Sequence, residues 1–101
     1  MNKHIPKKRW GQNFLIDSNI INKITSAINV NPNDRILEIG PGKGAITAPL
    51  AIKAESITAI EIDSNLCSSL EKQNISKLKI INNDFLKVDL EELDSNIVVG
   101  N

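Results

Sequence analysis

Three glycines alternate with other residues in the run Glu38-Ile39-Gly40-Pro41-Gly42-Lys43-Gly44, and such a run is suited to holding a nucleotide. Gly40 permits a tight turn, and Gly42 lets a ligand approach the backbone. Gly44 allows the next helix to pack closely, with its N–H groups facing the site. A glycine-rich turn without a ligand is the alternative. The apolar segment before the run and the helical pattern after it favour the nucleotide site.

Two classes of ligand fit this loop. Gly40, Gly42 and Ala45 also match the dinucleotide fingerprint, which accepts Ala at its third glycine position. Both classes need an acid after the second strand to bind ribose hydroxyls, and Glu61 follows Gly40 by about 20 residues. Asp63 is a weaker candidate for the ribose and a better cap for the following helix. The loop and Glu61 therefore leave both ligand classes open.

Two further features favour S-adenosylmethionine. Glu38 lies two residues before Gly40, where its carboxylate can meet the cationic end of a ligand and would repel a pyrophosphate. Asp84 follows a third apolar segment and can accept a hydrogen bond from an adenine amino group, while Phe85 can pack on the ring. The alternatives are a turn-forming Asp84 and a core Phe85. The acids indicate S-adenosylmethionine as the cofactor.

Strands and helices alternate along the chain and must position these residues. Apolar segments predict strands at 35–39, 56–62, 77–82 and 96–99. We expect a helix from Asp17 or Ser18 to about 28, with Ile20, Ile21, Ile24 and Ile28 on one face. Further helical patterns cover about 43–53, where Pro49 requires a late start or a kink, and 63 to about 74, with a short turn at 89–93. The pattern predicts an α/β fold, about half of a doubly wound parallel sheet covered on both faces.

Length and composition limit the domain organisation, the kinds of site and the partners that are possible. The 101 residues make one domain at most, and no apolar run approaches the roughly 20 residues that cross a bilayer. Cys67 is the one cysteine, so we expect neither a disulfide within the chain nor a metal site. The net charge is zero, but Lys7, Lys8 and Arg9 precede the first acid. They predict an arm for RNA phosphates, and a solvated terminus is the alternative.

The glycines and acids from Glu38 to Asp84 resemble the class I, Rossmann-like S-adenosylmethionine methyltransferases. The opening Lys7-Lys8-Arg9-Trp10-Gly11-Gln12-Asn13-Phe14-Leu15 resembles the first motif of the rRNA adenine N6,N6-dimethyltransferase family, with Trp10 where that family usually has Phe. The final Val98-Val99-Gly100-Asn101 resembles the beginning of its catalytic Asn-Leu/Ile-Pro-Tyr/Phe motif. The resemblance covers the whole chain.

The resemblance implies roles for individual residues. Asn101 would be catalytic, beside the target adenine. The expected cofactor contacts are Asn13, Leu15, Glu38, Gly40, Gly42, Glu61, Asp84, Phe85 and Asn101. Among them Gly40 would contact the methionine part, Glu61 the ribose, and Asp84 the adenine amino group.

One branch of the family dimethylates two adjacent adenosines near the 3′ end of small-subunit rRNA, and the other dimethylates a large-subunit adenosine and gives macrolide resistance. Gly11 before Gln12, and Pro41 within the loop, resemble the first branch. The resemblance implies a cytoplasmic, monomeric enzyme of ribosome biogenesis, whose partner is the immature small subunit.

We expect residues 1–16 to form a basic arm with a cofactor-contacting motif, and 17–101 to form part of the methyltransferase domain. The catalytic motif ends here at its first residue, Asn101. We therefore expect an N-terminal fragment with no more than trace methyl transfer by itself. A nicotinamide-dependent oxidoreductase domain and a non-catalytic RNA-binding protein are the alternatives from other classes.

Overall fold

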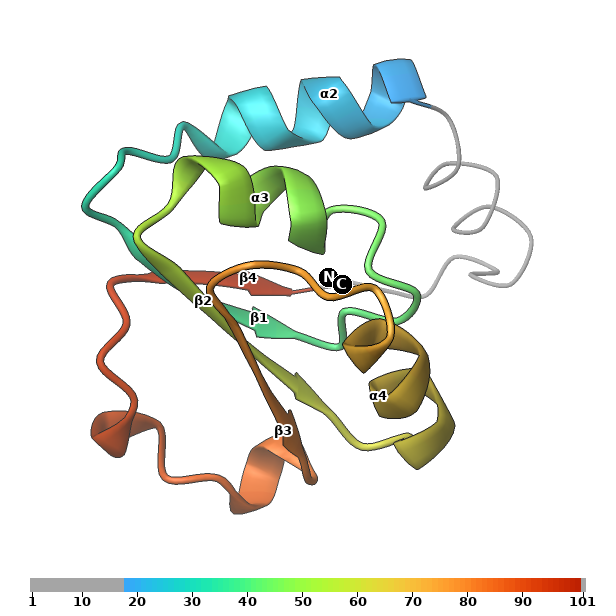
Figure 1. The fold of residues 1–101 in the computed structure, drawn as a ribbon. Coiled ribbons are helices and arrows are strands. Elements are labelled where there is room, and N and C mark those ends of the chain that lie inside the picture. Colours follow the sequence, from blue (N-terminus) through green and yellow to red (C-terminus); the bar gives the residue numbers. More distant parts are fainter. Residues whose placement is uncertain (1–17, 101) are drawn as a thin grey trace.

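The computed structural model describes residues 18–100. Four parallel strands form one sheet in the order β3-β2-β1-β4 (Figure 1). The strands are β1 (Arg35–Ile39), β2 (Ser56–Glu61), β3 (Leu78–Asn82) and β4 (Ile97–Gly100). The helices are α2 (Ser18–Ile28), α3 (Thr47–Lys53) and α4 (Ser64–Glu71), and two 3-10 turns follow, η1 (Phe85–Lys87) and η2 (Leu90–Glu92). The predicted α/β fold, with four parallel strands and flanking helices, is confirmed.

The strand order reverses beside β1. The chain moves outward from β1 through β2 to β3, and then returns to place β4 on the other side of β1. In the sheet register Ile39 of β1 pairs with Ile60 of β2 and with Gly100 of β4. In open α/β sheets ligands bind outside the carboxyl ends of the strands at such a reversal. The glycine loop begins at Gly40, directly at this point.

The three helices cover one face of the sheet. Ile36 pairs in register with Ile57 and Ile97, and all three belong to the apolar core that α2 and α3 cover. Leu78 is in register with Ile57 and borders a hollow together with Leu70 of α4, so α4 lies on the same face.

Within residues 18–100 the helices therefore lie on one face only. Leu37 and Ile60 belong to the opposite face and are 2% and 1% exposed, so the central strands are covered on both faces as predicted, but the second face carries no helix of the described residues. A right-handed return from β3 to β4 has to cross the opposite face. That connection, residues 83–96, forms the 3-10 turns η1 and η2 in place of a helix.

The core is built from aliphatic side chains, as the scarcity of aromatics requires. Its buried members are Ile36, Ile46, Leu50, Ala51, Ala54 and Ile57. From α2, Ile21, Ile24 and Ile28 pack against this cluster, as predicted. Ile20, the fourth residue predicted on that face, is half-buried, and Thr25 is the buried residue of the helix.

Element boundaries differ from the predicted ones by a few residues. Pro49 lies in the first turn of α3, where its missing N–H costs no hydrogen bond, so the helix begins late instead of kinking. The helix α4 ends at Glu71, three residues before Asn74, whose backbone has a φ of 52°. Lys77 has a φ of 69° and precedes β3, and its ammonium donates to the Ala54 carbonyl at 2.6 Å.

A polar clasp joins β1 to β4 at the amino end of the sheet. The Arg35 amide donates to Asn96 Oδ1 at 2.7 Å, and Asn96 Nδ2 donates to Asp34 Oδ1 at 2.8 Å. Arg35 also forms an ion pair with Asp94 at 3.2 Å. These contacts lie at the opposite end of the strands from the glycine loop, so they hold β4 in place without occupying the site.

Candidate functional site

The glycine loop is a tight turn with an open inner surface. Gly40, Gly42 and Gly44 have φ values of 70°, 60° and 83°, a region that side chains other than glycine rarely adopt. The Gly40 amide donates to the Ile60 carbonyl at 2.9 Å, and the Gly44 amide donates to the Pro41 carbonyl at 2.9 Å. Within residues 18–100, no heavy atom lies within 4 Å of a Cβ built on Gly40 or Gly42. The described residues therefore leave space for a ligand beside these two glycines.

Gly44 has a different requirement. A Cβ there would lie 2.6 Å from Leu70 Cδ1, and Gln73 Nε2 of the same region donates to the Lys43 carbonyl at 2.8 Å. The helix that approaches Gly44 is therefore α4. The prediction that the glycine makes room for the next helix, α3, named the wrong element, because α3 does not begin until Thr47.

Glu38 is a buried carboxyl group beside the loop. Its side chain is 1% exposed, and Oε1 accepts a hydrogen bond from Thr47 Oγ1 at 2.6 Å. The other oxygen, Oε2, is buried and has no hydrogen-bond partner among residues 18–100. Burial raises the pKa of Glu38 to about 7, and the Thr47 hydrogen bond opposes that rise. A buried acceptor without a partner is costly, so this oxygen is suited to a cationic donor.

Glu61 is fixed against the loop by two backbone amides. Its Oε1 accepts from the Gly42 amide at 3.2 Å, and its Oε2 accepts from the Asp63 amide at 3.1 Å. The residue is 7% exposed. Each carboxylate oxygen can accept more than one hydrogen bond, so both oxygens keep capacity for ligand hydroxyls. The structure thus brings Glu61 together with the glycine loop.

Asp63 caps α4. Its Oδ1 accepts from the amides of Asn65 and Leu66 at 2.8 and 3.2 Å, which satisfies two of the free N–H groups at the helix start. The sequence-based preference for Asp63 as a cap is confirmed.

The segment after β3 lies beside the end of β2. The Asn83 amide donates to the Glu61 carbonyl at 3.1 Å, which places Asp84 and Phe85 next in the chain at the same edge. Asp84 Oδ1 accepts from the Leu86 amide at 2.9 Å and caps η1, so its turn-forming role is observed. Asp84 and Phe85 are half-buried. Their contacts with adenine stay a prediction.

Sequence reasoning missed two residues at this edge. Thr47 is completely buried and bonded to Glu38, but a threonine at the start of a helical pattern gives no signal of a partner nine positions earlier. Ile62 was assigned to the second strand, yet it follows the strand and is 67% exposed between Glu61 and Asp63. The sequence did contain an indication that Ile62 lies at the site, because it is a large apolar residue between two acids.

Several predicted residues lie outside the described part of the chain. They are Asn13, Leu15 and Asn101 at the cofactor or target base, and Lys7, Lys8 and Arg9 in the basic arm.

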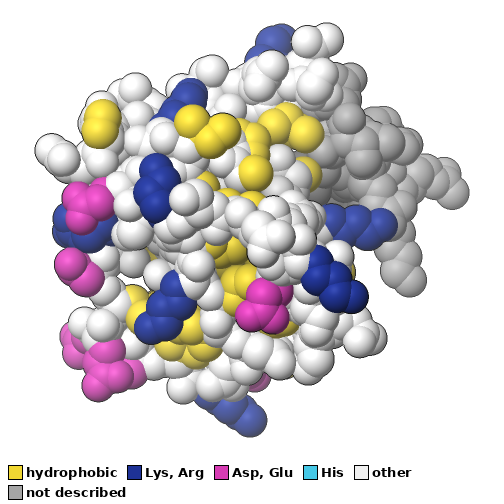
Figure 2. Space-filling model, viewed as in Figure 1, with side chains coloured by type: hydrophobic (Ala, Val, Ile, Leu, Met, Phe, Trp, Pro, Cys, Tyr) yellow, Lys and Arg dark blue, Asp and Glu magenta, His cyan; other side chains and the backbone are white. Residues whose placement is uncertain are grey.

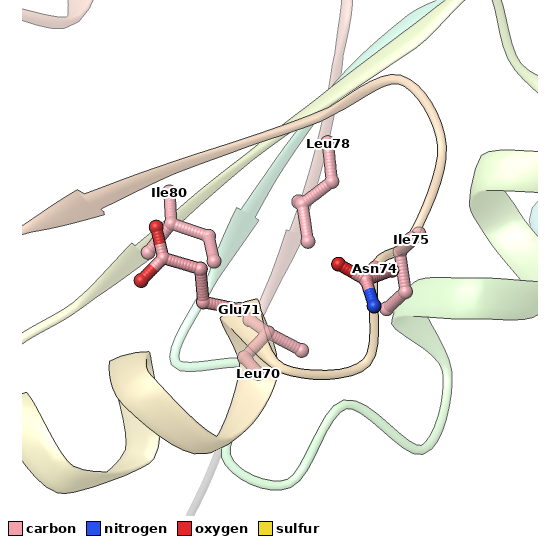
Figure 3. A pocket seen from close by; sticks show the side chains of 6 residues that line it. All are labelled: Leu70, Glu71, Asn74, Ile75, Leu78 and Ile80. Atoms are coloured by element: carbon pink, nitrogen blue, oxygen red, sulfur yellow. The ribbon is translucent and has the colours of Figure 1, made fainter.

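Two further surface features lie within residues 18–100, apart from the glycine loop. Figure 2 shows Lys and Arg side chains spread over one face, with several acidic side chains at its left edge and another near the centre. A hollow of about 240 Å³ lies between α4 and β3 (Figure 3), away from the strand-order reversal. Its lining residues are Leu70, Glu71, Asn74, Ile75, Leu78 and Ile80.

Residues 18–100 contain neither a group of metal-binding side chains nor a membrane-spanning helix. Within 18–100 no three His, Cys, Asp or Glu side chains gather as a metal-binding group. No helix in that range is both long and apolar enough to span a bilayer.

Known proteins resemble this chain in sequence and in fold. The family described as ribosomal RNA adenine dimethylase matches residues 3–101. A ribosomal RNA small subunit methyltransferase A of Legionella pneumophila (strain Corby) is 49% identical over 102 residues, covering 98% of this chain and 40% of that protein. The chain therefore spans about 40% of the length of this curated relative.

Two solved structures share the fold. A dimethyladenosine transferase from Plasmodium falciparum has a TM-score of 0.74 at 27% identity, covering 84% of this chain and 32% of that one. The 23S rRNA methyltransferase ErmE has a TM-score of 0.69 at 35% identity, covering 76% of this chain and 32% of that one. With a match over nearly all its residues, the chain belongs to the ribosomal RNA adenine dimethylase family.

Proposed function

We propose that the chain provides the S-adenosylmethionine-binding part of an enzyme that dimethylates N6 of two adjacent adenosines near the 3′ end of small-subunit rRNA, in ribosome biogenesis. The observation that carries the cofactor assignment is the buried Oε2 of Glu38, which has no partner among the described residues beside an open glycine loop. A buried carboxylate suits a ligand with an ammonium group and opposes an anionic pyrophosphate.

The residues of this chain then have distinct tasks. Glu38 holds the ammonium of the amino-acid part, and Glu61 accepts from the ribose hydroxyls. Asp84 accepts from the adenine amino group, and Phe85 packs on the ring. Glycines 40 and 42 leave room for the ligand beside the backbone. When bound, the cofactor would supply a methyl group carried on a sulfonium, from which a neutral thioether leaves as the adenine N6 bonds to the methyl carbon, so no strong base is needed.

Catalysis in this proposal is mainly positioning. Asn101 accepts a hydrogen bond from the N6 amino group of the target adenine and aligns that nitrogen with the methyl group. Such alignment lowers the barrier by placing the reacting atoms before the reaction begins. Asn13 and Leu15 complete the cofactor contacts. Lys7, Lys8 and Arg9 bind rRNA phosphates, and replacing them with Ala would lower both the RNA affinity and its dependence on salt.

The small-subunit branch is preferred because the relative at 49% identity carries a small-subunit name. A large-subunit target is the second candidate, supported by the 35% identity with the 23S rRNA methyltransferase ErmE. The two branches are distinguished by methylation assays of a full-length enzyme that contains this chain, with unmethylated small and large ribosomal subunits as separate substrates. For the 101-residue chain alone we propose no more than background methyl transfer, in a monomeric and cytoplasmic protein.

The cofactor assignment is tested by calorimetric titration of the chain with S-adenosylhomocysteine and with NAD. We expect binding of S-adenosylhomocysteine and none of NAD at the same concentrations. Glu38→Gln should weaken S-adenosylhomocysteine about tenfold, since a hydrogen bond to a charged group is replaced by a neutral one. Preferential binding of NAD would revive the oxidoreductase alternative and refute the proposal.

A further inference from the structure

Thr47 links the glycine loop, the start of α3 and the end of β1. Its amide donates to the Gly44 carbonyl at 3.1 Å, and its hydroxyl donates to Glu38 Oε1 at 2.6 Å. Thr47 is 0% exposed and Glu38 is 1% exposed, so this hydrogen bond is sealed from solvent. One side chain therefore fixes the orientation of the buried carboxyl group.

The hydrogen bond divides the two oxygens of Glu38 between different tasks. Oε1 is occupied by Thr47, and Oε2 is left buried without a partner among the described residues. The hydrogen bond and the burial of both side chains together restrict rotation of the carboxyl group, and so limit the directions in which Oε2 can face. We infer that Thr47 is a positioning residue that aims Glu38 Oε2 at the ammonium group of the cofactor's amino-acid part. This inference rests on the S-adenosylmethionine site proposed above.

A second buried threonine shows that the hydrogen bond from Thr47 to Glu38 differs from the one that a threonine in a helix usually forms. Thr25 of α2 is 3% exposed, and its hydroxyl donates to the Ile21 carbonyl of its own helix at 3.0 Å. Such a local bond is the common way for a helical threonine to satisfy its hydroxyl. Thr47 instead donates to an acid on another element. Thr25 therefore provides a matched control for Thr47.

The test compares two ligands that differ in the group Glu38 would bind. S-adenosylhomocysteine carries the ammonium group, and 5′-methylthioadenosine has the same adenosine and thioether but lacks the amino-acid part. We expect Thr47→Val to weaken S-adenosylhomocysteine about tenfold and to change the affinity for 5′-methylthioadenosine less than about twofold. Thr47→Ser keeps the hydroxyl and should restore the wild-type ratio of the two affinities. Thr25→Val should leave that ratio unchanged.

A double-mutant cycle shows whether Thr47 acts through Glu38. In the Glu38→Gln background, Thr47→Val should cause little further loss of S-adenosylhomocysteine affinity, because the charge it positions is gone. Equal losses for both ligands, or fully additive losses in the cycle, would overturn the inference.

Two controls keep the outcomes separate. If the wild-type chain binds neither ligand, the proposed cofactor site itself fails and the inference fails with it. If Thr47→Val loses its cooperative thermal transition, the Thr47→Ser variant is used for the test instead. The inference is overturned if Thr47→Ser binds 5′-methylthioadenosine with wild-type affinity but loses the preference for S-adenosylhomocysteine.

Discussion

The Gly42 amide donates a hydrogen bond of 3.2 Å to Glu61 Oε1, which joins the middle of the glycine loop to the last residue of β2. The acid predicted to bind ribose therefore also holds the loop in shape. Because the second oxygen accepts from the Asp63 amide, Glu61 serves two backbone donors at once. If the proposed site is right, loop geometry and ribose recognition depend on the same carboxylate.

The first prediction follows from this shared role. Glu61→Ala should weaken S-adenosylhomocysteine by at least about tenfold, because it removes the ribose acceptor and leaves two amides without their partner. Glu61→Gln should lose less, since its amide oxygen can still accept from one of them. Calorimetric titration of both variants checks the order. Glu55→Ala, at an exposed acid that precedes β2, should bind like wild type. Equal affinities in Glu61→Ala and wild type would contradict the assignment.

The second prediction concerns the pH dependence of stability. Burial raises the pKa of Glu38 from 4.5 to about 7 in the folded chain. The folded state therefore binds more protons than the unfolded state in this window. The contribution of Glu38 is fully present below pH 4.5 and is lost as pH rises through about 7. The loss approaches about 1.4 kcal/mol per pH unit within the window.

Urea unfolding of wild type and Glu38→Gln at several pH values between about 4.5 and 8 measures this effect. The stability of Glu38→Gln relative to wild type should increase up to about pH 7 and then level off. Thr25→Val, which carries no titrating group, should show a constant difference from wild type. A constant difference for Glu38→Gln as well would show that Glu38 titrates at the same pH in both states.

The third prediction separates space from backbone conformation in the glycine loop. Gly44→Ala should destabilise the chain by about 2 kcal/mol or more, because its Cβ would lie 2.6 Å from Leu70 Cδ1 at a φ of 83°. At Gly40 the φ is 70°, but no heavy atom of residues 18–100 lies within 4 Å of the added Cβ, so only about 1 kcal/mol of conformational cost is expected for Gly40→Ala. Urea unfolding measures both. In a cycle with Leu70→Ala, the Gly44→Ala cost should shrink, and additive costs would rule out the clash.

The fourth prediction distinguishes the cap from the site. Asp63→Ala should lower stability by about 1 kcal/mol, since Oδ1 accepts from the Asn65 and Leu66 amides. Its affinity for S-adenosylhomocysteine, once corrected for the folded fraction, should remain within about twofold of wild type. Asp63→Ser should recover most of the stability. A large loss of affinity without a loss of stability would instead assign Asp63 to the ribose.

Local patterns predicted the elements that local forces determine. The segment 35–39 forms a strand with the predicted bounds, and Asp63 caps its helix as expected. Pro49 correctly indicated a late start for α3, because a proline fits a first turn and not an interior. In the site, the glycines and Glu61 meet as their spacing predicted.

What the sequence left open depends on contacts between distant residues. The bond between Thr47 and Glu38 joins a helix to a strand, and no local pattern specifies it. Lys77 was expected to begin a strand, but its ammonium bonds to the Ala54 carbonyl and its backbone takes a positive φ instead. The helix that approaches Gly44 could not be chosen from order along the chain, since α4 reaches the glycine through Leu70.

The clasp between Arg35 and Asn96 has a consequence for how the chain folds. β1 can pair with β2 after a short crossover, but its pairing with β4 has to close a loop that includes β2 and β3. Loop-closure entropy makes such a distant contact slow to form. We therefore expect β4, the strand that completes the reversal beside the glycine loop, to dock after β2 and β3, so that the site at the reversal is completed late in folding.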